Sequence, residues 1–262
     1  MKQLLGSMSI IIALCLSVSA GAAEKVVRLA TLTDFAPYCF KKESSAHIAR
    51  EVIPPGKNSL QLQGYSWDVV REIFHAMDYT IELRVVPWSR VMHYLRVGKV
   101  DAIFPANRTA AREEIFIFSR KPVDTTRMVV YTPAPSSLQW RDLSSLNGLR
   151  VGAVRGWAYG KKWEDSNGMD KVLMDTILQS FQVMDKARVD AVIGYEQVYD
   201  YVLSSNEISD KYKKIGQFGR VVEYLMAQKH STVAQRIVSD FDRGYLRLER
   251  GGGLEKIMQK WQ

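Results

Sequence analysis

Apolar positions along the chain follow two periods, which together predict an alternation of helices and strands. Spacings of three and four residues, typical of a helix with one buried face, predict helices over residues 67–77, 89–97, 176–187, 233–248 and 254–261. Short runs rich in β-branched residues predict strands over residues 26–32, 81–86, 100–104, 128–131, 149–154, 189–193 and 221–227. Ser66 is placed to cap the first helix, and Gly98 follows the second, where left-handed backbone is common.

The predicted elements occur in a similar order twice. Strands and helices alternate over residues 26–104, and the alternation returns after the Pro- and Ser-rich turn at 133–137. This order favours mainly parallel sheets flanked by helices, so the predicted fold class is α/β. Residues 41–63 are polar and contain Pro54-Pro55-Gly56, and we expect a long excursion there, either a mobile loop or a flap.

A short motif also occurs twice. The hexamer at residues 98–103 (GKVDAI) returns at residues 187–192 as ARVDAV, each time between a predicted helix and a predicted strand. A repeated helix–turn–strand unit predicts two similar lobes, and a cleft between lobes is a common place for a small ligand. We expect Asp101 and Asp190 of the two motifs to be structural, because both stand at the start of a strand.

The N-terminal segment has a composition of its own. Residues 1–23 combine Lys2, an apolar core over 10–18 and a run of small residues at 19–23, which is the pattern of a cleavable signal peptide. An N-terminal membrane anchor is the alternative, and the cleavage site stays open among residues 20, 22 and 23. Secretion to the periplasm would leave Cys39 as the one cysteine of the mature chain, and we expect it to be buried.

Composition and charge exclude several kinds of protein. The chain is 47% hydrophobic and 24% charged, as is ordinary for a globular protein, and no later segment is long and apolar enough to span a bilayer. The net charge of +8 comes from basic residues mixed with acidic ones, so we expect no nucleic-acid partner. The four histidines are scattered, and no nucleotide-binding or nucleophile motif occurs, so we expect no metal and no cofactor.

Aromatic residues gather at predicted strand ends. The carboxyl ends of parallel strands face the ligand crevice of an α/β sheet, so aromatic residues there suggest a stacking pocket, with core packing as the alternative for any one of them. The residues are Phe35, Tyr38, Trp88, Trp157, Tyr159 and Tyr195. Arg112 follows the first hexamer, and an arginine in a cleft can bind a carboxylate through two parallel hydrogen bonds.

Several loose motifs stand in the order that a known family shows. They are residues 35–38 (FAPY), 64–68 (GYSWD), 87–88 (PW), 98–102 (GKVDA), 109–112 (TAAR), 118–119 (FS), 146–152 (LNGLRVG), 188–191 (RVDA), 253–257 (GLEKI) and 260–261 (KW). The chain resembles the bacterial extracellular solute-binding proteins of family 3, the periplasmic polar amino-acid-binding type that serves ABC transporters. The resemblance covers nearly all of the mature chain.

The resemblance implies a two-lobed periplasmic binding protein fold of type II, in which each lobe is a mainly parallel sheet flanked by helices. Lobe 1 would hold residues 24–120 plus 224–262, and lobe 2 residues 127–217, with hinge strands at about 121–126 and 218–223. A small ligand, an amino acid or another small carboxylate, would lie between the lobes and be buried when they close. The partner would be a permease or a sensor in the inner membrane.

The resemblance also assigns residues to the ligand. It implies that Arg112 binds an α-carboxylate, that Phe35 and Trp88 are aromatic walls, and that Asn107 stands at a position usually held by a hydroxyl residue. Tyr38 belongs to the same aromatic loop as Phe35, and we include it among the candidate binding residues.

Two positions depart from the family pattern. Tyr195 stands where the family usually has an acidic residue for the ligand's α-amino group, and Gly156-Trp157 replaces a Gly-Thr turn. A buried ammonium without a carboxylate partner is costly. Either Glu196 or Glu223 substitutes, or Trp157 and Tyr195 hold the ammonium by cation–π contact, or the ligand is not an ordinary α-amino acid.

The sequence thus predicts a binding protein without catalysis. Two alternatives stay open. The first is a secreted cyclic-acid dehydratase of the same fold, which would need Glu196 as a general acid with a pKa raised by burial. The second is a ligand-sensing partner of a membrane receptor. The identity of the ligand and the oligomeric state do not follow from the sequence.

Overall fold

The computed structural model describes residues 25–43 and 45–261 of the chain. The predicted signal peptide therefore lies outside the described residues. The main feature is a nine-stranded sheet with the strand order β10-β9-β11-β8-β12-β7-β1-β6-β4, and a small sheet of order β2-β3-β5 lies beside it. None of the helices in the described part of the chain has the length and hydropathy needed to cross a bilayer.

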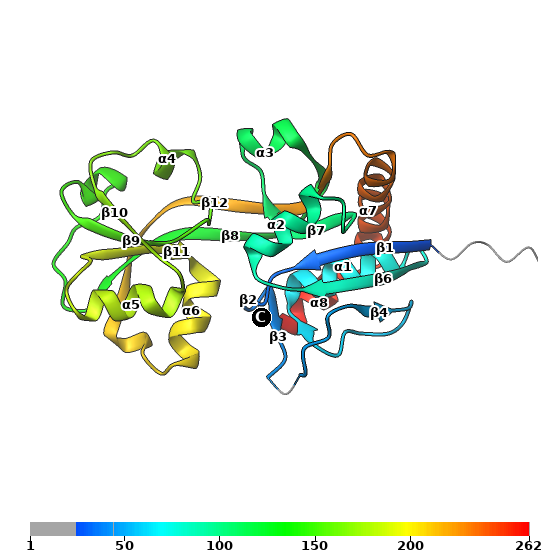
Figure 1. The fold of residues 1–262 in the computed structure, drawn as a ribbon. Coiled ribbons are helices and arrows are strands. Elements are labelled where there is room, and N and C mark those ends of the chain that lie inside the picture. Colours follow the sequence, from blue (N-terminus) through cyan, green and yellow to red (C-terminus); the bar gives the residue numbers. More distant parts are fainter. Residues whose placement is uncertain (1–24, 44, 262) are drawn as a thin grey trace, which may run out of the picture.

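Two long antiparallel strands, β8 (Phe116–Pro133) and β12 (Tyr212–Gln228), run through the middle of the large sheet. Strands β7, β1, β6 and β4 extend the sheet on the side of β12, and β11, β9 and β10 extend it on the side of β8. We call the first group with α1–α3, α7 and α8 the first lobe, and the second group with α4–α6 the second lobe. Figure 1 shows the two lobes on either side of the β8–β12 connection.

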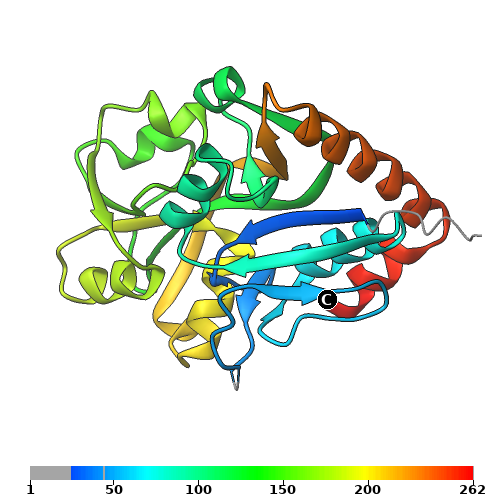
Figure 2. The same ribbon diagram turned by 45° about the vertical axis from the view of Figure 1, so that its right-hand side comes forward.

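The first lobe is an α/β unit in which β1 pairs in parallel with β6 and β7, whereas β4 and the small sheet pair antiparallel. Its strands are β1 Lys25–Thr31, β2 Asp34–Phe35, β3 Cys39–Lys41, β4 Glu51–Ile53, β5 Leu62–Gln63, β6 Tyr79–Val85 and β7 Ala102–Asn107. Its helices are α1 Tyr65–His75, α2 Trp88–Arg96, α3 Ala110–Ile115, α7 Thr232–Arg250 and α8 Gly253–Trp261. The apolar stripe of α1 is fully buried at Trp67 and Phe74, and Phe74 packs on Phe241 of α7. The C-terminal helices thus return to the lobe in which the chain begins (Figure 2).

The second lobe is a smaller unit of the same kind. Its elements are β9 Arg150–Val154, α4 Lys161–Glu164, β10 Asp170–Met174, α5 Ile177–Asp185, β11 Ala191–Tyr195 and α6 Glu196–Ser205, with short 3-10 turns at Leu143–Leu146 and Ser209–Lys211. Strand β9 pairs in parallel with both β10 and β11. Its core is aromatic: Phe181 of α5 packs on Tyr131 of β8 and on Tyr199 of α6.

The repeated hexamers have the same structural role in both lobes. Asp101 accepts hydrogen bonds from the backbone N–H of Arg28 at 2.8 Å and from its guanidinium at 2.5 Å. Asp190 binds Arg150 in the same way, at 2.8 and 2.7 Å. Each aspartate therefore ties the turn before one strand to the neighbouring strand. The expectation that both are structural is confirmed.

Three expectations about local structure need correction. Residues 41–63 are not a flap, because β4 pairs with β6 at the sheet edge and β5 pairs with β3. Ser66 is not the N-cap of α1: Gly64 holds that position, and Ser66 lies within the helix with its hydroxyl bonded to Asp124. Strands β8 and β12 are much longer than the strands predicted at 128–131 and 221–227. Cys39 is fully buried, as expected.

Candidate ligand-binding site

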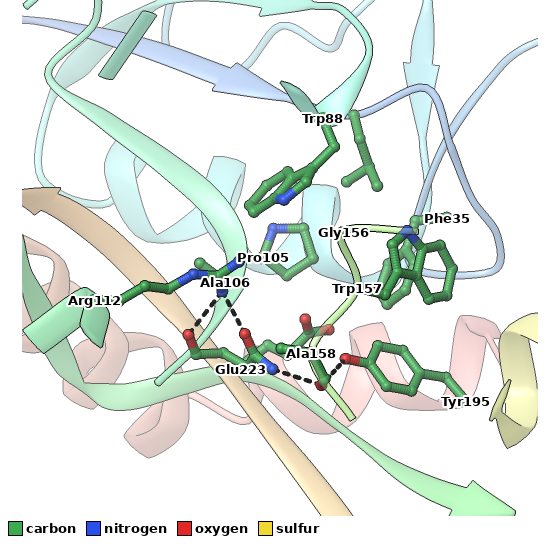
Figure 3. Close-up of a pocket in the computed structure, with 12 residues that line it drawn as sticks. Phe35, Trp88, Pro105, Ala106, Arg112, Gly156, Trp157, Ala158, Tyr195 and Glu223 are labelled. Atoms are coloured by element: carbon green, nitrogen blue, oxygen red, sulfur yellow. Dashed lines mark hydrogen bonds between the residues drawn. The ribbon is translucent and has the colours of Figure 1, made fainter. Parts of the chain in front are cut away.

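A pocket lies between the lobes, with about 350 Å³ of empty space that is continuous with solvent. It is lined from the first lobe, from the second lobe and from strand β12, so a molecule inside it contacts all three. The lining residues are Leu32, Phe35, Trp88, Pro105, Ala106, Asn107, Arg112, Gly156, Trp157, Ala158, Tyr195 and Glu223. Figure 3 shows ten of them around the pocket. Six of the eight binding residues predicted from the sequence lie in this lining.

Arg112 is the basic residue of the lining, and the first lobe fixes its position. It lies on α3, whose N-cap Thr109 accepts a hydrogen bond from the backbone N–H of Arg112. Its Nη1 donates to the backbone oxygen of Asn107 at 3.0 Å and to the side-chain oxygen of the same residue. Among the described residues, no group accepts from its Nε or Nη2. Burial lowers the pKa of Arg112, but a guanidinium stays protonated in proteins. The two donor nitrogens Nε and Nη2 thus remain for an anionic ligand.

Asn107 and Tyr195 meet at one carbonyl across the cleft. Asn107 Nδ2 donates to the backbone oxygen of Ala158 at 2.9 Å, and Tyr195 Oη donates to the same oxygen at 2.8 Å. Asn107 belongs to the first lobe, and the other two residues belong to the second. Since Asn107 also holds Arg112, one chain of hydrogen bonds joins Arg112 to the second lobe. This arrangement is a closed cleft.

Three aromatic rings form one wall of the pocket. Phe35 of the first lobe lies 5.5 Å from Trp157 and 5.8 Å from Tyr195, measured between ring centroids, and those two rings are 5.2 Å apart. Trp88 faces them from the N-terminus of α2, with the Arg112 guanidinium 5.6 Å from its ring centroid. Burial raises the pKa of Tyr195 well above its usual value, so this residue is neutral. The aromatic residues predicted to form a pocket are therefore brought together, although Tyr38 and Tyr159 pack against Phe35 and Tyr195 without lining the pocket.

The structure places Tyr38 and Glu196 outside the pocket lining. Tyr38 packs behind Phe35, and its hydroxyl donates to the backbone oxygen of Thr125. Glu196 begins α6, and its two carboxylate oxygens accept from Arg127 and Lys214. Burial raises the pKa of Glu196, but the hydrogen bonds from these two cations more than offset it, and the pKa is lowered overall. Glu196 is an ion-paired helix start, so the structure gives no support to its assignment as a ligand residue.

Glu223 is the carboxyl group of the lining. It lies on β12, directly opposite Asn107 of β7 on one side and Asp124 of β8 on the other. Sequence reasoning named Glu223 as one of several partners for an ammonium group but missed Asp124. The signal for Asp124 was an acidic residue within the predicted hinge at 121–126. Among the described residues, no group of three or more His, Cys, Asp or Glu could hold a metal.

Two α/β lobes that enclose a small pocket, with an arginine from one lobe and aromatic rings from both, define a solute-binding protein. The chain belongs to the bacterial extracellular solute-binding proteins, family 3, whose family model matches residues 27–262. A curated relative, the L-cystine-binding protein TcyJ of Bacillus subtilis (strain 168), is 26% identical over 214 residues, which are 77% of this chain and 76% of the relative.

Solved structures share the fold. A histidine kinase sensor domain with similarity to periplasmic binding proteins superposes with a TM-score of 0.76 and 19% identity, covering 91% of this chain and 96% of that one. An ancestral arginine-binding protein bound to glutamine has a TM-score of 0.71 and 20% identity, with 90% and 97% covered. At such identities the likeness shows the fold alone, and the two-lobed type II fold expected from the sequence is confirmed.

Proposed function

We propose that this chain is a periplasmic binding protein that captures a small, carboxylate-bearing, amino-acid-like solute between its lobes for an ABC-type permease of the inner membrane. The observation that carries the proposal is Arg112: a fixed guanidinium inside the pocket, whose Nε and Nη2 bind no acceptor among the described residues. A planar carboxylate fits two parallel N–H groups of a guanidinium better than it fits any other side chain.

The remaining lining residues have supporting roles in this proposal. Phe35, Trp88, Trp157 and Tyr195 pack against the apolar part of the ligand, and Asn107 orients Arg112 while it bridges to Ala158. The hinges at 121–126 and 218–223 lie within β8 and β12, the strands that pass between the lobes. Bending of these strands would open the pocket, and ligand contacts with both lobes would favour the closed form.

Thermal unfolding of the mature protein against a panel of ligands tests the proposal. The panel holds L-amino acids, including L-cystine, L-glutamine and L-arginine, together with dicarboxylates, amines and small cyclic acids. A ligand that binds only the folded state stabilises it by about 2.7 kcal/mol at 100 times its dissociation constant. We expect such a shift with at least one small carboxylate and none with the amines.

Two substitutions show whether Arg112 is the anchor. Arg112→Ala should weaken the binding of that carboxylate by about 100-fold, because each charge-assisted hydrogen bond contributes about 1.5–3 kcal/mol. Arg120→Ala is the matched control, since Arg120 is exposed and outside the pocket. Unchanged affinity in Arg112→Ala would refute the anchoring role, and a panel without any carboxylate ligand would refute the proposed function.

Sensing is the second candidate function, and the similarity to a histidine kinase sensor domain favours it. Uptake of the radiolabelled ligand by cells that lack this chain separates the two. Loss of uptake supports delivery to a permease. Normal uptake with loss of ligand-dependent transcription supports a sensor. For the dehydratase alternative, we expect no turnover of the cyclic acids, since Glu196 is held in ion pairs outside the pocket.

A further inference from the structure

Two carboxyl groups face each other beside the pocket, one on each of the strands that join the lobes. Asp124 of β8 and Glu223 of β12 are directly opposite in the antiparallel register. They are 4% and 5% exposed. Like charges at directly opposed strand positions are destabilising, and buried charges normally have a counter-ion. A pair that breaks both rules, with one member in the lining of a binding pocket, points to a role in ligand recognition.

The hydrogen bonds of this pair are incomplete. Ser66 donates its hydroxyl to Asp124 Oδ2, whereas Asp124 Oδ1 and Glu223 Oε2 are buried and lack a hydrogen-bond partner among the described residues. Ionised carboxylates only accept hydrogen bonds, so two facing carboxylates can satisfy each other only when they share a proton. Burial raises the pKa of both groups, and the charge of Asp124 raises that of Glu223 further. The geometry of the pair and its burial thus both favour one shared proton in the ligand-free protein.

Among the described residues, Arg112 is the basic side chain whose charge reaches the pair. It lies on α3, and in the proposed function its free donors are taken by the ligand's carboxylate. The other titratable groups that interact with the pair stay neutral because burial raises the pKa of each; they are Tyr38, Cys39, Tyr65 and Tyr195. No basic side chain of the described residues forms an ion pair with either carboxyl, so the place of a counter-ion is open.

The two members of the pair face different spaces. Glu223 lines the ligand pocket, while Asp124 lines a separate, solvent-open groove together with Tyr65, Tyr245 and Trp261. A cationic group in the pocket thus reaches Glu223, and a proton leaving the pair has a path to solvent on the side of Asp124. Glu223 also neighbours Asn107, the residue that holds Arg112. The receptor for a positive group is therefore on the strand next to β7, whose last residue holds the receptor for a negative group.

We propose that Glu223 binds the ammonium group of the ligand and that Asp124 is a positioning residue, which keeps Glu223 protonated until that ammonium arrives. This inference rests on the proposed function and adds the substrate class: a zwitterion with a carboxylate for Arg112 and an ammonium for Glu223. On binding, the O–H bond of the shared proton breaks, the proton goes to solvent, and an N–H of the ammonium donates to the Glu223 carboxylate. One proton is released for each ligand bound, so charge and atoms balance.

Calorimetry with a matched ligand pair tests the proposal. The probes are the tightest-binding L-amino acid of the panel and the 2-hydroxy acid that has the same side chain. Titration at neutral pH in two buffers with different ionisation enthalpies gives the number of protons exchanged. We expect release of about one proton with the amino acid and none with the hydroxy acid. The amino acid should also bind more tightly as pH rises, until the pair is ionised.

Two variants separate the roles of the carboxyl groups. Glu223→Gln should weaken binding of the amino acid by about 100-fold and leave the hydroxy acid nearly unaffected, because the ammonium then lacks its carboxylate. Asp124→Asn should keep the binding of the amino acid, release less than half a proton, and extend tight binding to lower pH. A merely structural role for Asp124 would change stability without moving this pH profile.

Glu51→Gln is the control, since Glu51 is a second buried carboxyl that lies in β4, outside the pocket. Equal binding of amino acid and hydroxy acid, or unchanged selectivity in Glu223→Gln, would overturn the inference and leave the proposed function standing. Selective binding of the hydroxy acid would also overturn the inference and leave the proposed function standing. Failure of every carboxylate in the panel would overturn both.

The ligand-free protein offers an independent check. The raised pKa of Glu223 means that the folded state holds a proton that the unfolded chain loses above about pH 4.3. Stability should therefore fall as pH rises from this value towards the raised pKa, and Glu223→Gln should flatten this slope. An identical pH dependence in the two proteins would contradict the shared proton.

Discussion

The two lobes are built on the same α/β unit, but the strands that follow the two hexamers end in residues of different chemistry. In both, an aspartate at the start of the strand binds an arginine of the neighbouring strand, Asp101 with Arg28 and Asp190 with Arg150. In the first lobe the strand then runs to Asn107, which holds Arg112 in the pocket. In the second lobe the corresponding strand ends at Tyr195, whose hydroxyl binds a backbone carbonyl of its own lobe.

This difference distinguishes the residues that support the fold from those that contact the ligand. The shared aspartates support each sheet and stay away from the pocket, whereas the residues after each strand determine what each lobe offers to a ligand. The first lobe offers charge through Arg112, and the second offers aromatic cover through Trp157 and Tyr195. In our account the acidic group that the second lobe lacks is supplied by Glu223 of strand β12.

The largest effect should come from breaking the two aspartate–arginine pairs. Asp101→Ala should lower the free energy of unfolding by about 2 kcal/mol, because its side chain is only 8% exposed and its loss leaves a partly buried backbone N–H without an acceptor. Asp190→Ala should cost about 1 kcal/mol, since that side chain is 35% exposed. Urea unfolding measures both, and equal losses would show that the two lobes use the motif identically.

A second comparison concerns the residues that follow the strands. Asn107→Ala should weaken ligand binding about tenfold, a loss of about 1.4 kcal/mol, because Arg112 loses its orienting partner and the cleft loses its bond to Ala158. Glu196→Gln should change affinity by less than about twofold, because Glu196 contacts Arg127 and Lys214 instead of the pocket. Calorimetry checks both, and a large loss in Glu196→Gln would restore it as a ligand residue.

A smaller effect is expected at the turns before the repeated strands. Gly98 and Ala187 occupy the same place in the two motifs, with φ of 69° and 51°. Left-handed backbone costs a residue with a Cβ about 1 kcal/mol relative to glycine. Ala187→Gly should therefore stabilise the protein by about 0.5 kcal/mol, and Gly98→Ala should destabilise it by about 1 kcal/mol, although the added methyl group meets no atom. Shifts of the same sign in thermal unfolding would contradict this.

The smallest effect is a difference in acid stability. Hydrogen bonds from Arg150 lower the pKa of Asp190 in the folded protein. Its contribution is therefore present above the unfolded pKa of about 3.9 and is lost as pH falls through the lowered value. Asp190→Asn should lose less stability than the wild type between pH 4 and pH 2. Parallel curves for the two proteins would show that Asp190 contributes nothing through its charge.

The sequence predicted well what depends on local pattern. The repeated hexamer, the helix periods and the buried Cys39 all follow from short-range composition, and the structure agrees with them. The long strands β8 and β12 were only partly predicted, because their pairing is irregular at several positions and the apolar alternation is interrupted there. Ser66 was misassigned for a similar reason: its partner, Asp124, is 58 positions away in the sequence.

The sequence predicted most residues of the site, but it did not predict which carboxyl groups are already bound by neighbouring side chains. Aromatic residues and Arg112 could be placed from strand-end positions and from the family resemblance. The choice between Glu196 and Glu223 could not be made, because it depends on which side chains of other strands already satisfy each carboxylate. Arg127 and Lys214 satisfy Glu196, whereas Glu223 faces another acid. Such cross-strand neighbours become visible only when the register of the sheet is known.

A crystal structure of the mature protein with the tightest-binding ligand of the panel tests the central claim most directly. Our account predicts that the ligand lies between the lobes, with its carboxylate on Nε and Nη2 of Arg112 and its ammonium within hydrogen-bond distance of Glu223. A ligand bound outside this pocket, or one whose carboxylate is held by the second lobe while Arg112 contacts only Asn107, would contradict it.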